Sequence, residues 1–181
     1  MYTPSSTVLY LAAIAGVAHV SATPVASSQP GELRFLSAET LPNNKGTLTF
    51  YGAAPSASSP AAGEPLAPRA CSTSDVTCDS DNVPDPAVCG GLIDILREGG
   101  SRAVPQSPLS ICLTLDGANA SRCCVTWSAP VPNLDQKYLV PAATKVFNEC
   151  LPLGLSGLAR NVDLVGVCAV QCLSNRPDPC R

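Results

Sequence analysis

Apolar residues recur at helical spacing in a stretch near the middle of the chain. They lie one, three, one and three residues apart, so they share one face of a helix. These residues are Val88, Cys89, Leu92, Ile93 and Leu96. Asp85 followed by Pro86 is typical of a helix start. Gly99 and Gly100 are typical of a helix end. The pattern predicts a helix that begins after Asp85 and places Cys89 toward the core.

A similar spacing returns over residues 138–150. The apolar positions lie four, three, one and three residues apart, and they are Leu139, Ala143, Val146, Phe147 and Cys150. Pro141 fits the first helical turn, where the N–H that proline lacks would have no partner within the helix. A second helix is therefore predicted, again with a cysteine on its core face.

Alternating apolar positions predict a β-hairpin between these helices. Its strands are residues 111–115 and 123–127, and Asp116 with Gly117 opens the turn. One further strand is predicted over residues 161–174, interrupted or bulged near Gly166. The predicted fold class is therefore α+β: a small disulfide-rich domain with two helices packed on a mostly antiparallel sheet of about three strands.

Two cysteines are adjacent on the second strand of this hairpin. Because neighbouring strand residues project to opposite sides, Cys123 and Cys124 are expected to bond to two different elements. Such a pair would fasten both faces of one sheet.

The first 70 residues differ in character from the rest. Residues 7–20 form an apolar run that is short for a membrane span, and small residues follow it up to Ala22. Residues 1–22 are therefore predicted to be a signal peptide. Residues 23–70 are rich in Ser, Pro and Ala, which predicts a linker or pro-segment, with a possible strand at residues 46–52. Residues 71–181 form the predicted disulfide-rich domain.

All ten cysteines fall in this last segment. An even number of cysteines behind a signal peptide indicates disulfides, so five bridges of unassigned pairing are expected. Zinc binding is the weaker explanation because the Cys-x-x-Cys spacing is absent. The expected disulfide-forming residues are Cys71, Cys78, Cys89, Cys112, Cys123, Cys124, Cys150, Cys168, Cys172 and Cys180.

The single histidine, His19, lies within the predicted signal peptide. Cleavage would leave a chain without histidine, which excludes a Ser-His-Asp triad, a Cys-His pair and a histidine-bound zinc. A hydrolase that uses two carboxylates stays open, with the candidates Asp94, Glu98, Asp116, Asp135, Glu149 and Asp163. An acidic stretch suggests calcium, but turns and helix capping explain it more simply; its residues are Asp75, Asp79, Asp81 and Asp85. We therefore expect no catalytic residue, cofactor or metal.

The charge of the chain is nearly balanced, with 11 basic and 14 acidic residues. No cluster of Lys and Arg marks a nucleic-acid surface. After signal cleavage no apolar run is long enough for a membrane span, so a secreted, extracellular protein is expected. We also expect a monomer. Asn119, with Ala120 and Ser121, forms a glycosylation sequon in the predicted hairpin loop.

Two motifs resemble those of a known family. Residues 123–128 read Cys-Cys-Val-Thr-Trp-Ser, and residues 171–177 read Gln-Cys-Leu-Ser-Asn-Arg-Pro. Both are similar to the fungal WD-like domain family, and the resemblance covers about residues 46–180. It implies a small secreted fungal protein with no catalytic residues to carry over. A WD40 propeller is not implied, because the chain lacks a repeat of about 40 residues.

These observations predict an extracellular binding or interaction module of a fungus, effector-like, whose partner is an extracellular protein or a polysaccharide. The alternatives are a structural cell-wall glycoprotein with a glycosylated 23–70 segment and, with less support, a carboxylate-dependent hydrolase.

Overall fold

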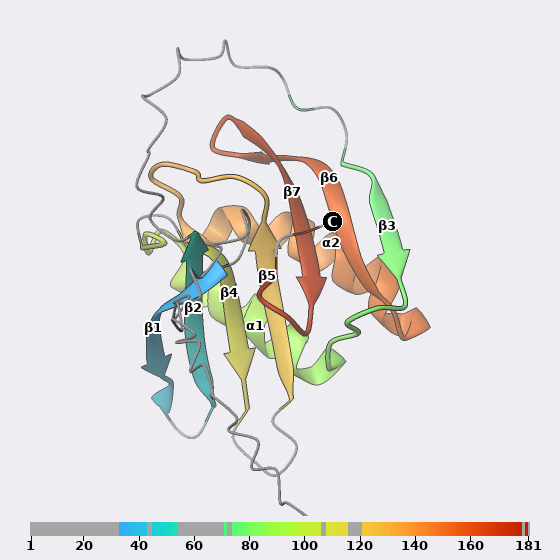
Figure 1. Cartoon of the computed structure of the whole chain (residues 1–181), viewed down its shortest axis with the longest axis horizontal. Helices are drawn as coiled ribbons and strands as arrows, with labels where there is room; N and C mark the ends of the chain where they lie inside the picture. Colours follow the sequence, from blue (N-terminus) through green and yellow to red (C-terminus); the bar gives the residue numbers. More distant parts are fainter. Residues whose placement is uncertain are drawn as a thin grey trace, which may run out of the picture.

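A computed structural model describes residues 33–42, 45–53, 71, 74–105, 108–115, 121–178 and 180. Its strands are β1 (Leu33–Thr40), β2 (Thr47–Ala53), β3 (Val76–Asp79), β4 (Pro108–Thr114), β5 (Arg122–Trp127), β6 (Ser156–Leu164) and β7 (Val167–Ser174). They form one sheet in the order β1-β2-β4-β5-β7-β6-β3 (Figure 1), and every neighbouring pair is antiparallel. The predicted signal peptide and Asn119 lie outside the described residues.

The predicted fold class is wrong. The molecule is mostly β, with a seven-stranded antiparallel sheet and two short helices, instead of an α+β domain with about three strands. Part of the difference comes from residues 33–53, within the stretch predicted to be a linker. The possible strand predicted at residues 46–52 is β2, which pairs with β4, whereas β1 was not predicted. The four-residue β3 also belongs to the sheet, at its opposite edge.

The strand predicted over residues 161–174 is in fact parts of two strands. The chain reverses between β6 and β7 at Val165 and Gly166, whose φ angles are 55° and 83°. The carboxylate of Asp163 accepts a hydrogen bond from the backbone N–H of Gly166 at 2.7 Å and so closes the turn. The irregularity near Gly166 is therefore a hairpin turn.

The helices are α1 (Pro86–Gly99) and α2 (Val140–Cys150), and a 3-10 turn, η2 (Gln136–Leu139), leads into α2. Asp85 caps α1, because its side chain accepts hydrogen bonds from the N–H groups of Ala87 and Val88 at 2.9 and 3.3 Å. Both helices contact the sheet, and Figure 1 shows them behind it. Helix α1 packs on β4 and β5, whereas α2 packs on β3, β6 and β7.

The hydrophobic core lies between the helices and the sheet. The sheet supplies Ile111, Val125 and Leu173, which are opposite one another on adjacent strands and fully buried. Helix α1 covers Ile111 and Val125 with Leu92 and Leu96, and α2 packs over β7. This layer supplies the main driving force for folding, because burial of apolar surface is the dominant favourable contribution.

The opposite face of the sheet also has a buried centre. Ser110 and Thr126 face each other across β4 and β5, both fully buried, with their hydroxyl oxygens 2.8 Å apart. The C-terminal segment reaches this face, since the Sγ atom of Cys180 lies 3.3 Å from the carbonyl oxygen of Thr126. The central strands are therefore shielded from solvent on both faces.

Candidate functional site

All ten cysteines form disulfides. The pairs are Cys71–Cys168, Cys78–Cys150, Cys89–Cys123, Cys112–Cys124 and Cys172–Cys180. Two of them attach a helix to the sheet, because Cys89 belongs to α1 and Cys150 to α2. The chain is thus a small disulfide-stabilised protein.

The adjacent cysteines of β5 bond in opposite directions. Cys123 is bonded to Cys89 on the helix side of the sheet. Cys124 is bonded to its cross-strand neighbour Cys112 on β4, on the other side. One strand is therefore joined covalently to the layer of helices and to the strand beside it.

An open hollow of about 530 Å³ lies where three distant parts of the chain meet. Its walls are the residues before α1, the start of β5 and the turn after β7. Arg122 and Arg176 line it, together with Asp85 and Asn175. The sequence alone does not indicate that these residues meet, since their proximity depends on strand pairing and on disulfides that the sequence leaves unassigned.

The walls of the hollow are fixed to one another by hydrogen bonds. The backbone N–H of Asn175 donates to the carbonyl of Asn82 at 2.9 Å. The side-chain amide of Asn175 donates to the carbonyl of Val83 at 3.2 Å. The turn after β7 is thereby attached to the loop that precedes α1.

Disulfides flank each of the three walls. Cys123 follows Arg122 directly, and its bond to Cys89 joins β5 to the first turns of α1. The Cys172–Cys180 bond closes a short loop that contains Asn175 and Arg176. Disulfides thus join two of the walls, β5 and the start of α1, and close the loop that forms the third.

The hollow carries an excess of positive charge. Of its three charged residues, two are arginines, and the carboxylate of Asp85 is occupied by the backbone N–H groups of α1. Arg122 donates from Nε to the hydroxyl of Thr114 at 3.3 Å. In the described part of the chain, neither Arg122 nor Arg176 forms an ion pair. This arrangement suits the binding of an anionic group.

The carboxylates considered for hydrolysis mostly have local structural roles. Asp94 pairs with Arg97 at 2.5 Å, Asp135 pairs with Lys137 at 3.4 Å, and Asp163 closes the β6–β7 turn. Asp116 lies outside the described residues.

The acidic stretch considered for calcium has similar local roles. Asp79 accepts a hydrogen bond from the backbone N–H of Asp81, and Asp85 caps α1. Within the ranges that the structure describes, no three His, Cys, Asp or Glu side chains gather in a way that could hold a metal ion.

The two motifs singled out in the sequence lie on paired strands. Cys124 is opposite Ser174, Thr126 is opposite Cys172, and Trp127 is opposite Gln171. The motifs are therefore two halves of one β-ladder, at the centre of the sheet. A family model described as Fungal WD-like matches residues 48–180 and so covers both halves.

The chain belongs to the fungal WD-like family.

The match to the fungal WD-like family includes six of the seven strands, both helices and all five disulfides, while β1 precedes it. Searches of curated proteins and of solved structures find no match. None of the helices among the described residues is long and apolar enough to cross a membrane.

Proposed function

We propose that this fungal WD-like protein is secreted and acts outside the cell as a binding module without a catalytic site. In this proposal the hollow holds acidic groups of the partner between Arg122 and Arg176. The hollow itself is the observation that supports the proposal. It has two arginines that form no ion pair in the described chain, and disulfides flank its walls.

The chemistry of arginine favours this assignment. A guanidinium group presents its N–H donors in a planar fork that matches a carboxylate, and hydrogen bonds between charged groups are among the strongest in proteins. A preformed site also avoids the entropy cost of ordering loops upon binding. The open shape of the hollow admits a group that projects from a larger molecule. The partner is therefore an acidic extracellular protein or an acidic polysaccharide.

The test measures binding of the purified protein to immobilised polygalacturonate, to a glutamate-rich protein and to a neutral glucan. We expect binding to one of the two acidic probes and none to the neutral glucan. In the variant R122A/R176A, binding should weaken at least tenfold, because loss of one charge-assisted hydrogen bond costs about 1.5–3 kcal/mol.

The matched control is R97A/R160A, which removes the same charge from arginines outside the hollow, at α1 and β6. It should leave binding within about twofold of the parent, as expected for surface charges remote from a contact. Equal losses in both double variants would show that only net charge matters, and the hollow would then have no specific role.

The alternative functions give different results in the same experiments. A structural wall protein would stay on insoluble wall material in the R122A/R176A variant. It would lose this retention when residues 54–70 are deleted and residues 23–53 are kept. A carboxylate-dependent hydrolase would release soluble sugars from a bound polysaccharide. Either result would replace the proposed binding function.

A further inference from the structure

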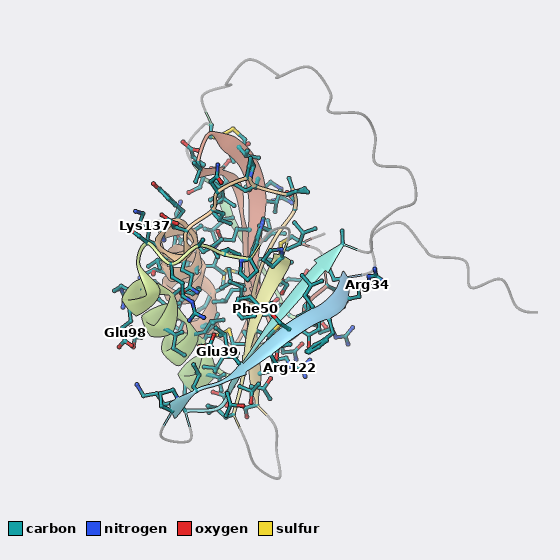
Figure 2. All side chains as sticks on the ribbon, turned by 90° about the vertical axis from the view of Figure 1, so that its left-hand side faces the viewer. Arg34, Glu39, Phe50, Glu98, Arg122 and Lys137 are labelled. Carbon is teal, nitrogen blue, oxygen red and sulfur yellow. A yellow bond between two sulfur atoms is a disulfide. The ribbon has the colours of Figure 1, made fainter. Side chains whose placement is uncertain are left out.

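The strand β1 forms one edge of the sheet and is exposed along most of its length. Among the described residues, only β2 pairs with it. Phe35 and Leu36 are 61% and 42% exposed, although both are large apolar residues. Figure 2 shows β1 across the side of the molecule that faces the viewer, with Arg34 toward one end and Glu39 toward the other.

This edge differs from the opposite edge of the sheet. The strand there, β3, has four residues, whereas β1 has eight. An edge strand offers unpaired backbone N–H and C=O groups to any extended chain, and short length is one way in which proteins protect such an edge. The longer edge exposes apolar side chains, but it also carries a bulge and charged residues, which protect an edge, so it suits only a partner with complementary charges.

A bulge places the two charged residues of β1 on the same face. Arg34 is opposite Gly52 on β2, and Glu39 is opposite Leu48. These partners are four residues apart on β2, so they share a face, whereas Arg34 and Glu39 are five residues apart. The irregularity between Phe35 and Ser37 accommodates the extra residue.

We propose that β1 pairs with β1 of a second copy of this chain, antiparallel and about a two-fold axis between Leu36 and Ser37. In this register Arg34 lies opposite Glu39 of the other copy, and Glu39 lies opposite Arg34 of the other copy. Unlike charges thus meet at both ends of the interface. The sheet continues from one copy into the other, and the same residues contact each other on both sides, as in isologous dimers.

The charges select this register over its neighbours. A shift of the pairing by one residue would place Arg34 opposite Ala38 or Thr40 of the other copy and would remove both charge pairs. The shift would also pair residues whose side chains point to opposite faces of the sheet, whereas paired residues must share a face. This mismatch disfavours the shifted pairing.

Both charged residues can contact a second copy of the chain. Arg34 is exposed and forms no ion pair among the residues that the structure describes. Glu39 is held in place by Arg102, with its Oε2 atom 2.6 Å from Nη2. A carboxylate accepts several hydrogen bonds, so Glu39 can contact a second arginine. The hydrogen bond from Arg102 to Glu39, and then the charge of Glu39, raise the pKa of Arg102, so its guanidinium stays protonated.

The dimer goes beyond the proposed binding function, uses a different surface and departs from the monomer expected from the sequence. It is tested by analytical ultracentrifugation of the purified protein over a range of concentrations. The parent should form a dimer. R34E and E39R should each weaken it at least tenfold, because each variant alone places like charges opposite each other. An equimolar mixture of the two should form a heterodimer, in which both charge pairs are again unlike.

Two controls keep the result interpretable. R97E makes the same charge change on α1 and should leave the dimer unchanged. Circular dichroism should show that R34E and E39R remain folded, which matters because E39R also loses the contact with Arg102. A parent that stays monomeric at every concentration overturns the proposal. So does a dimer that R34E leaves intact, or a mixture that fails to associate. If the parent is monomeric but R34E abolishes capture of an acidic extracellular protein, the edge serves a different partner and the dimer is rejected.

Discussion

Cys123 and Cys124 are adjacent on β5, and their disulfides lie on opposite faces of the sheet. The first reaches Cys89 on α1, and the second reaches Cys112 on β4. This geometry follows from the alternation of side chains along a strand, which makes a bond between the two neighbours unfavourable. The pair therefore links the central strand β5 covalently to α1 on one face and to β4 on the other.

The five disulfides should differ in how much they stabilise the fold. The Cys71–Cys168 and Cys172–Cys180 bonds span 97 and 8 residues, respectively. Replacing both cysteines of a pair by alanine should lower the free energy of unfolding by about 3–4 kcal/mol for the first and about 2–3 kcal/mol for the second. While Cys78–Cys150 is intact, the loop that Cys71–Cys168 closes is shortened to about 25 residues, which is still longer than the other loop and restricts the unfolded chain more. Urea unfolding of the two double variants measures the difference. Equal losses would show that local contacts, and not loop length, decide the effect.

The buried hydroxyl pair of β4 and β5 should show strong coupling. T126V leaves the hydroxyl of Ser110 without its partner and should cost about 1–3 kcal/mol. The double variant S110A/T126V should cost less than the sum of the two single variants, since neither side chain then has an unmet hydrogen bond. A double-mutant cycle by chemical unfolding gives the coupling energy. T47V serves as the control, because it makes the same substitution at a threonine of β2 that is only partly buried.

Two glycines should respond to alanine in opposite ways. At Gly157 a Cβ atom would lie 2.5 Å from the Sγ atom of Cys150 and 3.1 Å from the carbonyl oxygen of Thr77. G157A should therefore destabilise the fold by about 1–3 kcal/mol through overpacking. At Gly90, within α1, the nearest atom would be 4.0 Å away. G90A should stabilise the fold by about 0.5–1 kcal/mol because alanine favours the helix. Melting temperatures of the two variants test this contrast, which a loss of stability in G90A would contradict.

The helices and the central hairpin could be predicted because their signals are local. Asp85, Pro86 and Gly99 mark the ends of α1 within 15 residues, and the cap that Asp85 forms needs no distant partner. The opposite directions of Cys123 and Cys124 also follow from the geometry of one strand. Each of these inferences depends on a few neighbouring residues.

The rest of the sheet depends on distant pairing. β1 is exposed on both faces, so it lacks the regular alternation that indicates a strand. The β6–β7 turn places Val165 at a positive φ, where turn rules predict glycine, asparagine or aspartate. The hollow combines Asp85, Arg122 and Arg176, and nothing in their local sequences indicates that they meet.

The lone tryptophan should report on the integrity of the core. Trp127 is 1% exposed, and its indole N–H has no hydrogen-bond partner among the described residues. Its fluorescence should be blue-shifted relative to free tryptophan and should resist quenching by acrylamide until the protein unfolds. Reduction under native conditions tests whether packing alone keeps this environment. Strong quenching in the oxidised, folded protein would contradict the buried position.

The cysteines leave one end of the sheet without covalent support. β1 and β2 contain none, and β2 is held mainly by hydrogen bonds to β4 and by the burial of Leu48 and Phe50. In the oxidised protein, disulfides therefore hold the helices and the rest of the sheet together, while β1 and β2 can separate from them. Local opening should begin there, so amide hydrogens of β1 should exchange with solvent well before those of β5. Two molecules would also be able to swap these strands without breaking a single disulfide.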